Sequence, residues 1–207
     1  MDQQCYVGKK KLERGISLYK SAHPDSKDTF STTWKPFYLN AQAPKIGVDK
    51  KEFFASKFGH AKTEMMFGRL GAIGRDVGID FSFGGKTGNS RDSHRLIQLG
   101  KTKSPDVQTR VVEELFISYF ENEGDITSRD VLKAAGVKAG FPEAEVQDWL
   151  ESNKGGPEVD EEVAEAQLRG VSGVPNFVLQ SKYEIGGAQD AEAFAKVFEK
   201  IKELEGS

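Results

Sequence analysis

The feature of this sequence that most restricts its fold is a long helical stretch that lies between two shorter segments with strand character. From residue 49 to about residue 169, apolar residues recur at intervals of three to five, which is the spacing of amphipathic helices. One stripe contains Val107, Val111 and Leu115, and a second stripe runs beside it, so we expect this helix to be buried between partners.

Each flank of the helical stretch is predicted to combine a strand segment with a helix. Residues 30–39 are rich in Thr and aromatic residues and predict a strand, and residues 176–187 predict a hairpin that turns at Ser181–Lys182. Residues 6–20 and the segment after residue 187 show the apolar spacing of helices. The pattern therefore indicates an α/β fold. It divides the chain into three parts, residues 1–48, 49–169 and 170–207.

Charge and hydropathy exclude several classes of partner. The 207 residues include 29 basic and 32 acidic side chains, so the net charge of -3 provides no excess of positive charge for nucleic acid or an anionic membrane. The run Lys9–Lys11 has the character of a solvated helix face. No stretch has the length and apolarity of a spanning helix, and the polar start Met1–Gln4 does not resemble a signal peptide. We expect a cytoplasmic protein that binds neither nucleic acid nor membranes.

The residues that usually ligate metals are few and scattered. His23, His60 and His94 lie far apart in the sequence, and the single cysteine excludes an internal disulfide and a cysteine-rich metal site. The Gly-Gly-Lys-Thr segment that ends at Thr87 resembles the end of a phosphate-binding loop, but Asp80 stands where that motif needs its first glycine. We therefore expect no metal site and no tightly bound cofactor.

Two positions carry interesting chemistry, each with a structural and a functional interpretation. Cys5 lies at the start of the first helix, where unpaired N–H groups favour a thiolate, although a lone cysteine is commonly a small buried hydrophobe. Val174–Pro175 directly precedes a predicted strand, where a cis peptide bond is common, but an ordinary loop proline fits equally well. The residues alone leave both pairs of alternatives open.

Six segments, in order along nearly the whole chain, carry a family resemblance: CYVGKKKLE, WKPFYLN, TGNSRDSHRLI, VVEELFISYF, GVSGVPNFVL and YEIGGAQ. With them the chain resembles the DsbA-like oxidoreductases of the FrnE type, which are similar to 2-hydroxychromene-2-carboxylate isomerases and kappa-class glutathione transferases. The resemblance implies a thioredoxin-like fold with a large all-helical insertion between its two halves. It also implies that Val174–Pro175 is the cis-proline loop of the binding site.

The resemblance extends to further candidate site residues. Cys5 takes the position of the second, resolving cysteine, and Asn89 and His94 occupy a region that borders the substrate or glutathione pocket in the relatives. Asn89 or Ser90 also suits the cap of the following helix, which is the structural interpretation. The segment Gly187, Ala188 and Gln189 opens the last helix, whose amides could hold a carboxylate such as that of glutathione.

One departure from the family pattern affects the expected activity. Relatives begin with a strand followed by Cys-Pro-Trp-Cys-Tyr, whereas here Asp2 takes the place of the nucleophilic cysteine, Gln3 and Gln4 replace Pro and Trp, and the preceding strand is absent. Dithiol exchange, in which one thiolate attacks and a second resolves, is therefore not expected to run as usual. We expect a sheet of about three strands with an exposed edge, so that a homodimer is possible.

Three functions remain in view. The first is a thiol–disulfide oxidoreductase of the DsbA-like family that is inactive as a dithiol enzyme in this chain. The second is a glutathione-dependent transferase or isomerase, with glutathione as co-substrate, and the third is a non-catalytic thioredoxin-like binding protein. The expected partners are a thiol peptide, glutathione or a substrate that contains a disulfide.

Overall fold

The computed structural model describes residues 1–205, so the last two residues of the predicted part 170–207 lie outside the described residues. The chain forms two compact units. We call the first, Met1 and residues 31–170, the helical unit, and the second, residues 2–30 together with the chain from Val171 onward, the terminal unit. The boundaries lie at 30/31 and 170/171, so residues 31–48 belong to the helical unit rather than to the first predicted part.

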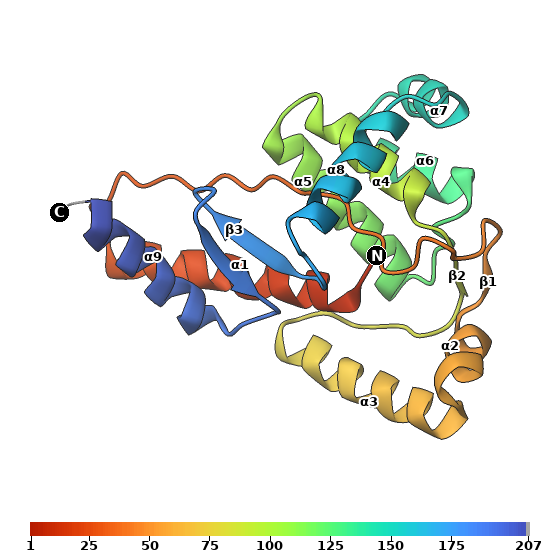
Figure 1. The fold of residues 1–207 in the computed structure, drawn as a ribbon, viewed down its shortest axis with the longest axis horizontal. Helices are drawn as coiled ribbons and strands as arrows, with labels where there is room; N and C mark the ends of the chain where they lie inside the picture. Colours follow the sequence, from red (N-terminus) through yellow and green to blue (C-terminus); the bar gives the residue numbers. More distant parts are fainter. Residues whose placement is uncertain (206–207) are drawn as a thin grey trace. The chain divides into compact units, whose positions relative to one another are not determined.

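The terminal unit consists of two helices and one hairpin (Figure 1). Its elements are α1 (Gln3–Ala22), β3 (Asn176–Leu179), β4 (Tyr183–Gly186) and α9 (Ala191–Glu205). β3 and β4 pair antiparallel, with Phe177 opposite Ile185. The predicted helix over 6–20 and the predicted hairpin are confirmed. The core of this unit contains Tyr19, Phe194 and Phe198, with Leu12, Ile16, Phe30, Phe177, Leu179 and Ile185 packed against them.

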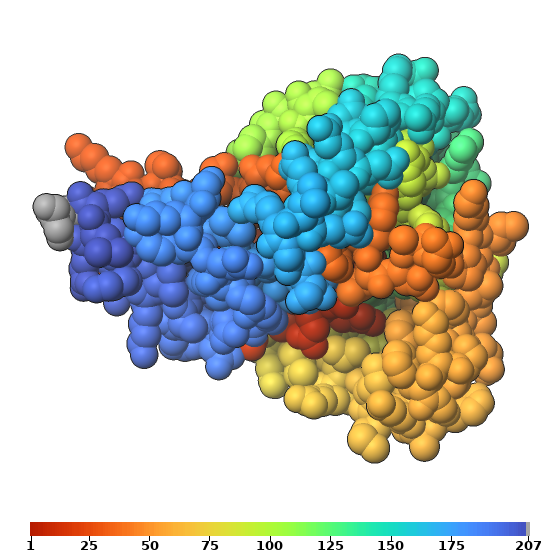
Figure 2. All heavy atoms as spheres, in the orientation of Figure 1, coloured from red at the N-terminus to blue at the C-terminus, as the bar shows by residue number. Residues whose placement is uncertain are grey.

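The two helices of the terminal unit approach closely at Gly15. A Cβ atom at Gly15 would lie 2.6 Å from Cβ of Phe194 and 2.8 Å from the carbonyl oxygen of Ala191, which is closer than real Cβ contacts allow. The missing side chain therefore brings α1 and α9 together. In the view of Figure 2, atoms of the C-terminal segment cover most of α1.

The helical unit confirms the predicted helical stretch. Its elements are β1 (Val48–Asp49), α2 (Lys50–Phe58), α3 (His60–Asp76), β2 (Lys86–Thr87), α4 (Arg91–Lys101), α5 (Pro105–Phe116), the π-helix η1 (Ile117–Glu121), α6 (Arg129–Lys138), α7 (Glu143–Glu151) and α8 (Gly156–Leu168). Val111 and Leu115 of α5 are completely buried, as predicted for a helix between partners. Leu96 of α4, Leu132 of α6 and Val146 of α7 complete the centre of this core.

The strand predicted over residues 30–39 is wrong. Within the described chain the segment is extended but pairs with no strand, because a side chain supplies its hydrogen bonds instead. The backbone N–H of Trp34 donates to Oε1 of Gln108 at 2.9 Å, and Nε2 of Gln108 donates to the carbonyl oxygen of Trp34 at 2.9 Å. The amide of the buried Gln108 thus takes the place of a neighbouring strand.

The predicted sheet of about three strands is also wrong. The described residues form two separate two-stranded pairs, β1 with β2 and β3 with β4. The predicted third strand is the segment around Trp34, which α5 holds. The fold is therefore mostly helical with a few short strands.

Candidate functional site

Cys5 is the third residue of α1 and lies in the first turn of this helix. The carboxylate of Asp2 caps this helix by accepting a hydrogen bond from the N–H of Gln4 at 2.7 Å. Burial, and then the negative charge of Asp2, raise the pKa of the Cys5 thiol to about 12. At neutral pH the side chain is therefore a thiol, which agrees with the second of the two interpretations that the sequence left open, a buried cysteine.

The loop before β3 faces the beginning of α1 within the terminal unit. The Val174–Pro175 peptide bond is cis, and Pro175 is buried. Gly8 lies one turn beyond Cys5 on the same side of α1. A Cβ at Gly8 would lie 3.0 Å from Cγ of Pro175 and 3.1 Å from Cζ of Phe177, so a larger residue would separate the helix from the loop.

The segment that opens α9 is tied to the same loop. The N–H of Gly187 donates to the carbonyl oxygen of Pro175 at 2.8 Å, and the N–H of Gln189 donates to Gly187 at 3.0 Å. Both amides thus already donate hydrogen bonds within the chain. A carboxylate ligand would need amides that are free to donate to it. Lys11 reaches the carbonyl oxygen of Ala188 at 3.3 Å and the carboxylate of Asp190 at 2.7 Å.

Within the terminal unit, the Val174–Pro175 loop therefore contacts α1 at Gly8, one turn beyond Cys5, and contacts the segment before α9 through Gly187. Gly8 and Lys11, which make these contacts, were missed by the sequence interpretation. A glycine three residues after a cysteine on a helix is the signal that could have identified Gly8. The Lys9–Lys11 run is not simply a solvated face, because Lys9 is buried and Lys11 is paired.

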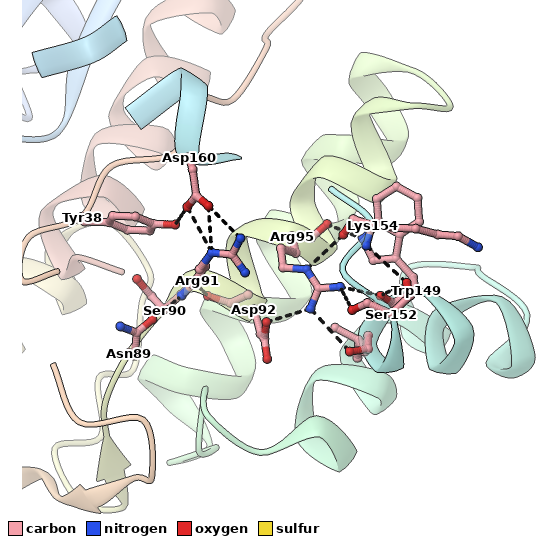
Figure 3. A network of polar contacts seen from close by, with 12 residues as sticks. Tyr38, Asn89, Ser90, Arg91, Asp92, Arg95, Trp149, Ser152, Lys154 and Asp160 are labelled. Carbon is pink, nitrogen blue, oxygen red and sulfur yellow. Dashed lines mark hydrogen bonds and ion pairs between the residues drawn. The ribbon is translucent and has the colours of Figure 1, made fainter. Parts of the chain in front are cut away.

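Asn89 lies two residues before the start of α4 (Figure 3). His94 lies in the first turn of α4, and both residues belong to the helical unit. Oδ1 of Asn89 accepts a hydrogen bond from the N–H of Arg91, the first residue of α4, at 2.9 Å, whereas Ser90 at the N-cap position makes no side-chain capping hydrogen bond. His94 is partly buried, and its Nε2 atom is buried without a hydrogen-bond partner in the described residues. Burial lowers the pKa of His94 to about 3, so its imidazole is neutral.

No group of three or more His, Cys, Asp or Glu side chains lies close enough together to hold a metal ion within residues 1–205. No helix in that same range is long and apolar enough to cross a membrane.

Solved structures with the same arrangement show which fold this is. A probable DsbA oxidoreductase from Streptomyces coelicolor is 24% identical with a TM-score of 0.82, and the match covers 96% of this chain and 85% of that one. A 2-hydroxychromene-2-carboxylate isomerase is 16% identical with a TM-score of 0.70, and the match covers 99% of this chain and 93% of that one. No curated protein matches the chain.

The sequence itself matches a family model over most of its length. The model describes a DSBA-like thioredoxin domain and matches residues 4–199. That range includes all of α1 except Gln3, the whole helical stretch, the Val174–Pro175 loop and the hairpin. The chain therefore belongs to the DSBA-like thioredoxin family, in a form with a single cysteine.

Proposed function

We propose that this protein is a thiol–disulfide protein of the DsbA-like family that carries out one half of the usual exchange through Cys5. The observation that supports the proposal is the position of Cys5, one helical turn before Gly8, whose backbone lies against Pro175. A thiol peptide, glutathione or a disulfide substrate would bind along the Val174–Pro175 loop. Glutathione would act as co-substrate rather than as a bound cofactor.

The first step of the exchange, formation of a mixed disulfide on Cys5, needs no second thiol in the chain. The Cys5 thiol loses its proton to solvent, and the thiolate attacks one sulfur of a disulfide. The bond from Cys5 to that sulfur forms, the original disulfide bond breaks, and the other sulfur leaves as a thiolate. Release of the mixed disulfide requires an external thiol, such as reduced glutathione, because Cys5 is the only cysteine of the sequence.

The raised pKa of Cys5 determines how this half-reaction depends on pH. With a pKa of about 12, the thiolate fraction rises about tenfold for each pH unit between pH 7 and pH 10. We expect the rate of adduct formation with oxidised glutathione to rise by the same factor, measured by intact mass. The Asp2→Asn variant retains a capping residue but removes the charge, so its adduct should form faster at pH 8.

The matched control and the contrary outcome both concern Cys5. The Cys5→Ser variant should form no adduct, and the unmodified chain should show no turnover in insulin reduction, because one thiol cannot release its own mixed disulfide. Insulin turnover that survives Cys5→Ser would refute the proposal.

The weak ionisation of Cys5 favours a second candidate, a glutathione-dependent transferase or isomerase. In such an enzyme the thiol of glutathione reacts, so the protein needs no thiolate of its own. Glutathione-dependent activity toward an aromatic substrate that is unchanged in Cys5→Ser would support this candidate. Glutathione binding without either activity would indicate a non-catalytic binding protein.

A further inference from the structure

We propose that Lys11 is a positioning residue for the ligand-binding loop at Val174–Pro175, and that it acts through the segment that precedes α9. The role of the loop in ligand binding rests on the proposed function. All the residues involved belong to the terminal unit, which contains α1, the loop and α9.

Lys11 continues a stripe of α1 that begins at the thiol. Cys5, Gly8 and Lys11 follow each other at intervals of three, so each lies beside the next on the helix surface. The loop touches this helix at Gly8, where a Cβ would lie 3.0 Å from Cγ of Pro175. A contact of this kind, between apolar atoms, has no preferred direction, so it does not by itself fix the orientation of the loop.

A second connection between α1 and the loop runs through Lys11. Its ammonium group donates to the carbonyl oxygen of Ala188 at 3.3 Å and to the carboxylate of Asp190 at 2.7 Å. The N–H of Gly187 in turn donates to the carbonyl oxygen of Pro175 at 2.8 Å. The loop is therefore held to α1 both directly at Gly8 and indirectly at Lys11.

The segment between Lys11 and the loop is a turn that is closed by its own hydrogen bonds. Gln189 donates from Nε2 to the carbonyl oxygen of Gly186 at 2.8 Å, and its backbone N–H donates to Gly187 at 3.0 Å. Gly187 has a φ of 78°, which a residue with a side chain rarely adopts. Because the turn is fixed in this way, a change at Lys11 is passed on to Pro175.

The exposure of the ion pair favours a geometric role over a stabilising one. The side chains of Lys11 and Asp190 are 23% and 79% exposed, so their pairing contributes little to the free energy of unfolding. The charges that shift the pKa of the Cys5 thiol are those of Asp2 and the N-terminus, and Lys11 is not one of them. Loss of Lys11 should therefore change how the ligand is held and leave the ionisation of the thiol as it is.

Saturation kinetics of adduct formation separate binding from reaction. In Lys11→Met we expect the half-saturating concentration of oxidised glutathione to rise about fivefold, the scale of one hydrogen bond, while the rate at saturation and its pH profile stay the same. Lys11→Arg, which retains the charge and the donors, should restore most of the binding. Lys20→Met removes the same charge from the last turn of α1 and should match the unmodified protein. An unchanged value in Lys11→Met, or an equal rise in Lys20→Met, would overturn this inference and leave the proposed function intact.

The variant Asp190→Asn distinguishes positioning from a direct contact between Lys11 and a carboxylate of the ligand. Asparagine suits the position before a helix as well as aspartate does, but it removes the charge that holds Lys11. Positioning predicts that the half-saturating concentration rises in this variant too. A lysine that is released to bind the ligand would lower it, and that result would overturn the positioning role.

Amide hydrogen exchange tests the connection without any reaction. The N–H of Gly187 should exchange about tenfold faster in Lys11→Met and Asp190→Asn than in Lys20→Met, because its hydrogen bond to Pro175 opens more often. Equal exchange in the three variants would overturn the role of Lys11. Faster exchange together with no Cys5 adduct, even in the unmodified protein, would refute the proposed function, and the role of Lys11 in ligand binding with it.

Discussion

Lys50 is the most unusual single residue of the helical unit. It is only 1% exposed, and its ammonium group donates to the carbonyl oxygen of Tyr119 at 3.2 Å and lies 4.2 Å from the centre of the Tyr119 ring. That carbonyl belongs to the π-helix η1, at a helix end where a positive charge is favourable. Burial outweighs these contacts and lowers the pKa of Lys50 to about 8.

This lowered pKa predicts a specific dependence of stability on pH. Between pH 8 and about 10.4 the unfolded chain holds the Lys50 proton and the folded chain does not, so folding becomes more favourable as pH rises. Relative to Lys50→Met, the unmodified protein should gain about 1 kcal/mol in free energy of unfolding for each pH unit in this window. Urea unfolding at pH 7.5 and pH 10 measures the gain. Lys51→Met alters the exposed neighbouring position and keeps Lys50, so this variant should show the same gain as the unmodified protein.

The glycines before Thr87 illustrate what a sequence cannot predict at the scale of a residue. A side chain at Gly84 would collide with the carboxylate of Glu123, and one at Gly85 with its backbone. The N–H of Gly84 donates to that carboxylate at 3.1 Å. The reason for the glycines is thus Glu123, a partner distant in the chain, which no local motif identifies.

At the scale of elements, the helices and strands that the spacing of apolar residues determines by itself were predicted correctly. The apolar stripe of α1 and the alternating residues of the hairpin are local patterns, and both elements form as expected. The strand around Trp34 failed because strand formation requires a partner, and the side chain of Gln108 supplied the hydrogen bonds. The same holds for the candidate site, since Cys5 and Pro175 could be named from the sequence but the contact through Gly8 could not.

The role of Gln108 can be tested by a change that retains its shape. Gln108→Met removes both hydrogen bonds to Trp34 and leaves a backbone donor and acceptor without partners, so we expect a loss of about 3 kcal/mol in free energy of unfolding. Urea denaturation measures this loss. Gln147→Met, which alters an exposed glutamine on α7, should change stability by less than about 0.5 kcal/mol. Equal effects of the two substitutions would show that Gln108 does not replace a strand.

At the scale of the whole molecule, the hairpin offers an edge for association. Among residues 1–205, β3 pairs only with β4, so its other edge has backbone groups without a strand partner. Val178 on this strand is 45% exposed. We expect concentration-dependent self-association, seen by sedimentation velocity, that Val178→Lys weakens about tenfold because like charges would meet across the edge. Val137→Lys, at a similarly exposed position on α6, should leave it unchanged. A chain that stays monomeric at high concentration would contradict this expectation.

The division of the terminal unit between the two ends of the chain has a consequence for synthesis on the ribosome. α1 is made before the residues that cover it at Gly15, which are Ala191 and Phe194 of α9. The helical unit, whose residues 31–170 are continuous apart from Met1, is completed in between. At translation rates of about 5–20 residues per second, this delay lasts roughly ten to thirty seconds. During that time the apolar face of α1 is exposed to chaperones and proteases. The yield of folded protein therefore depends on whether α9 covers this face before a protease cleaves the chain.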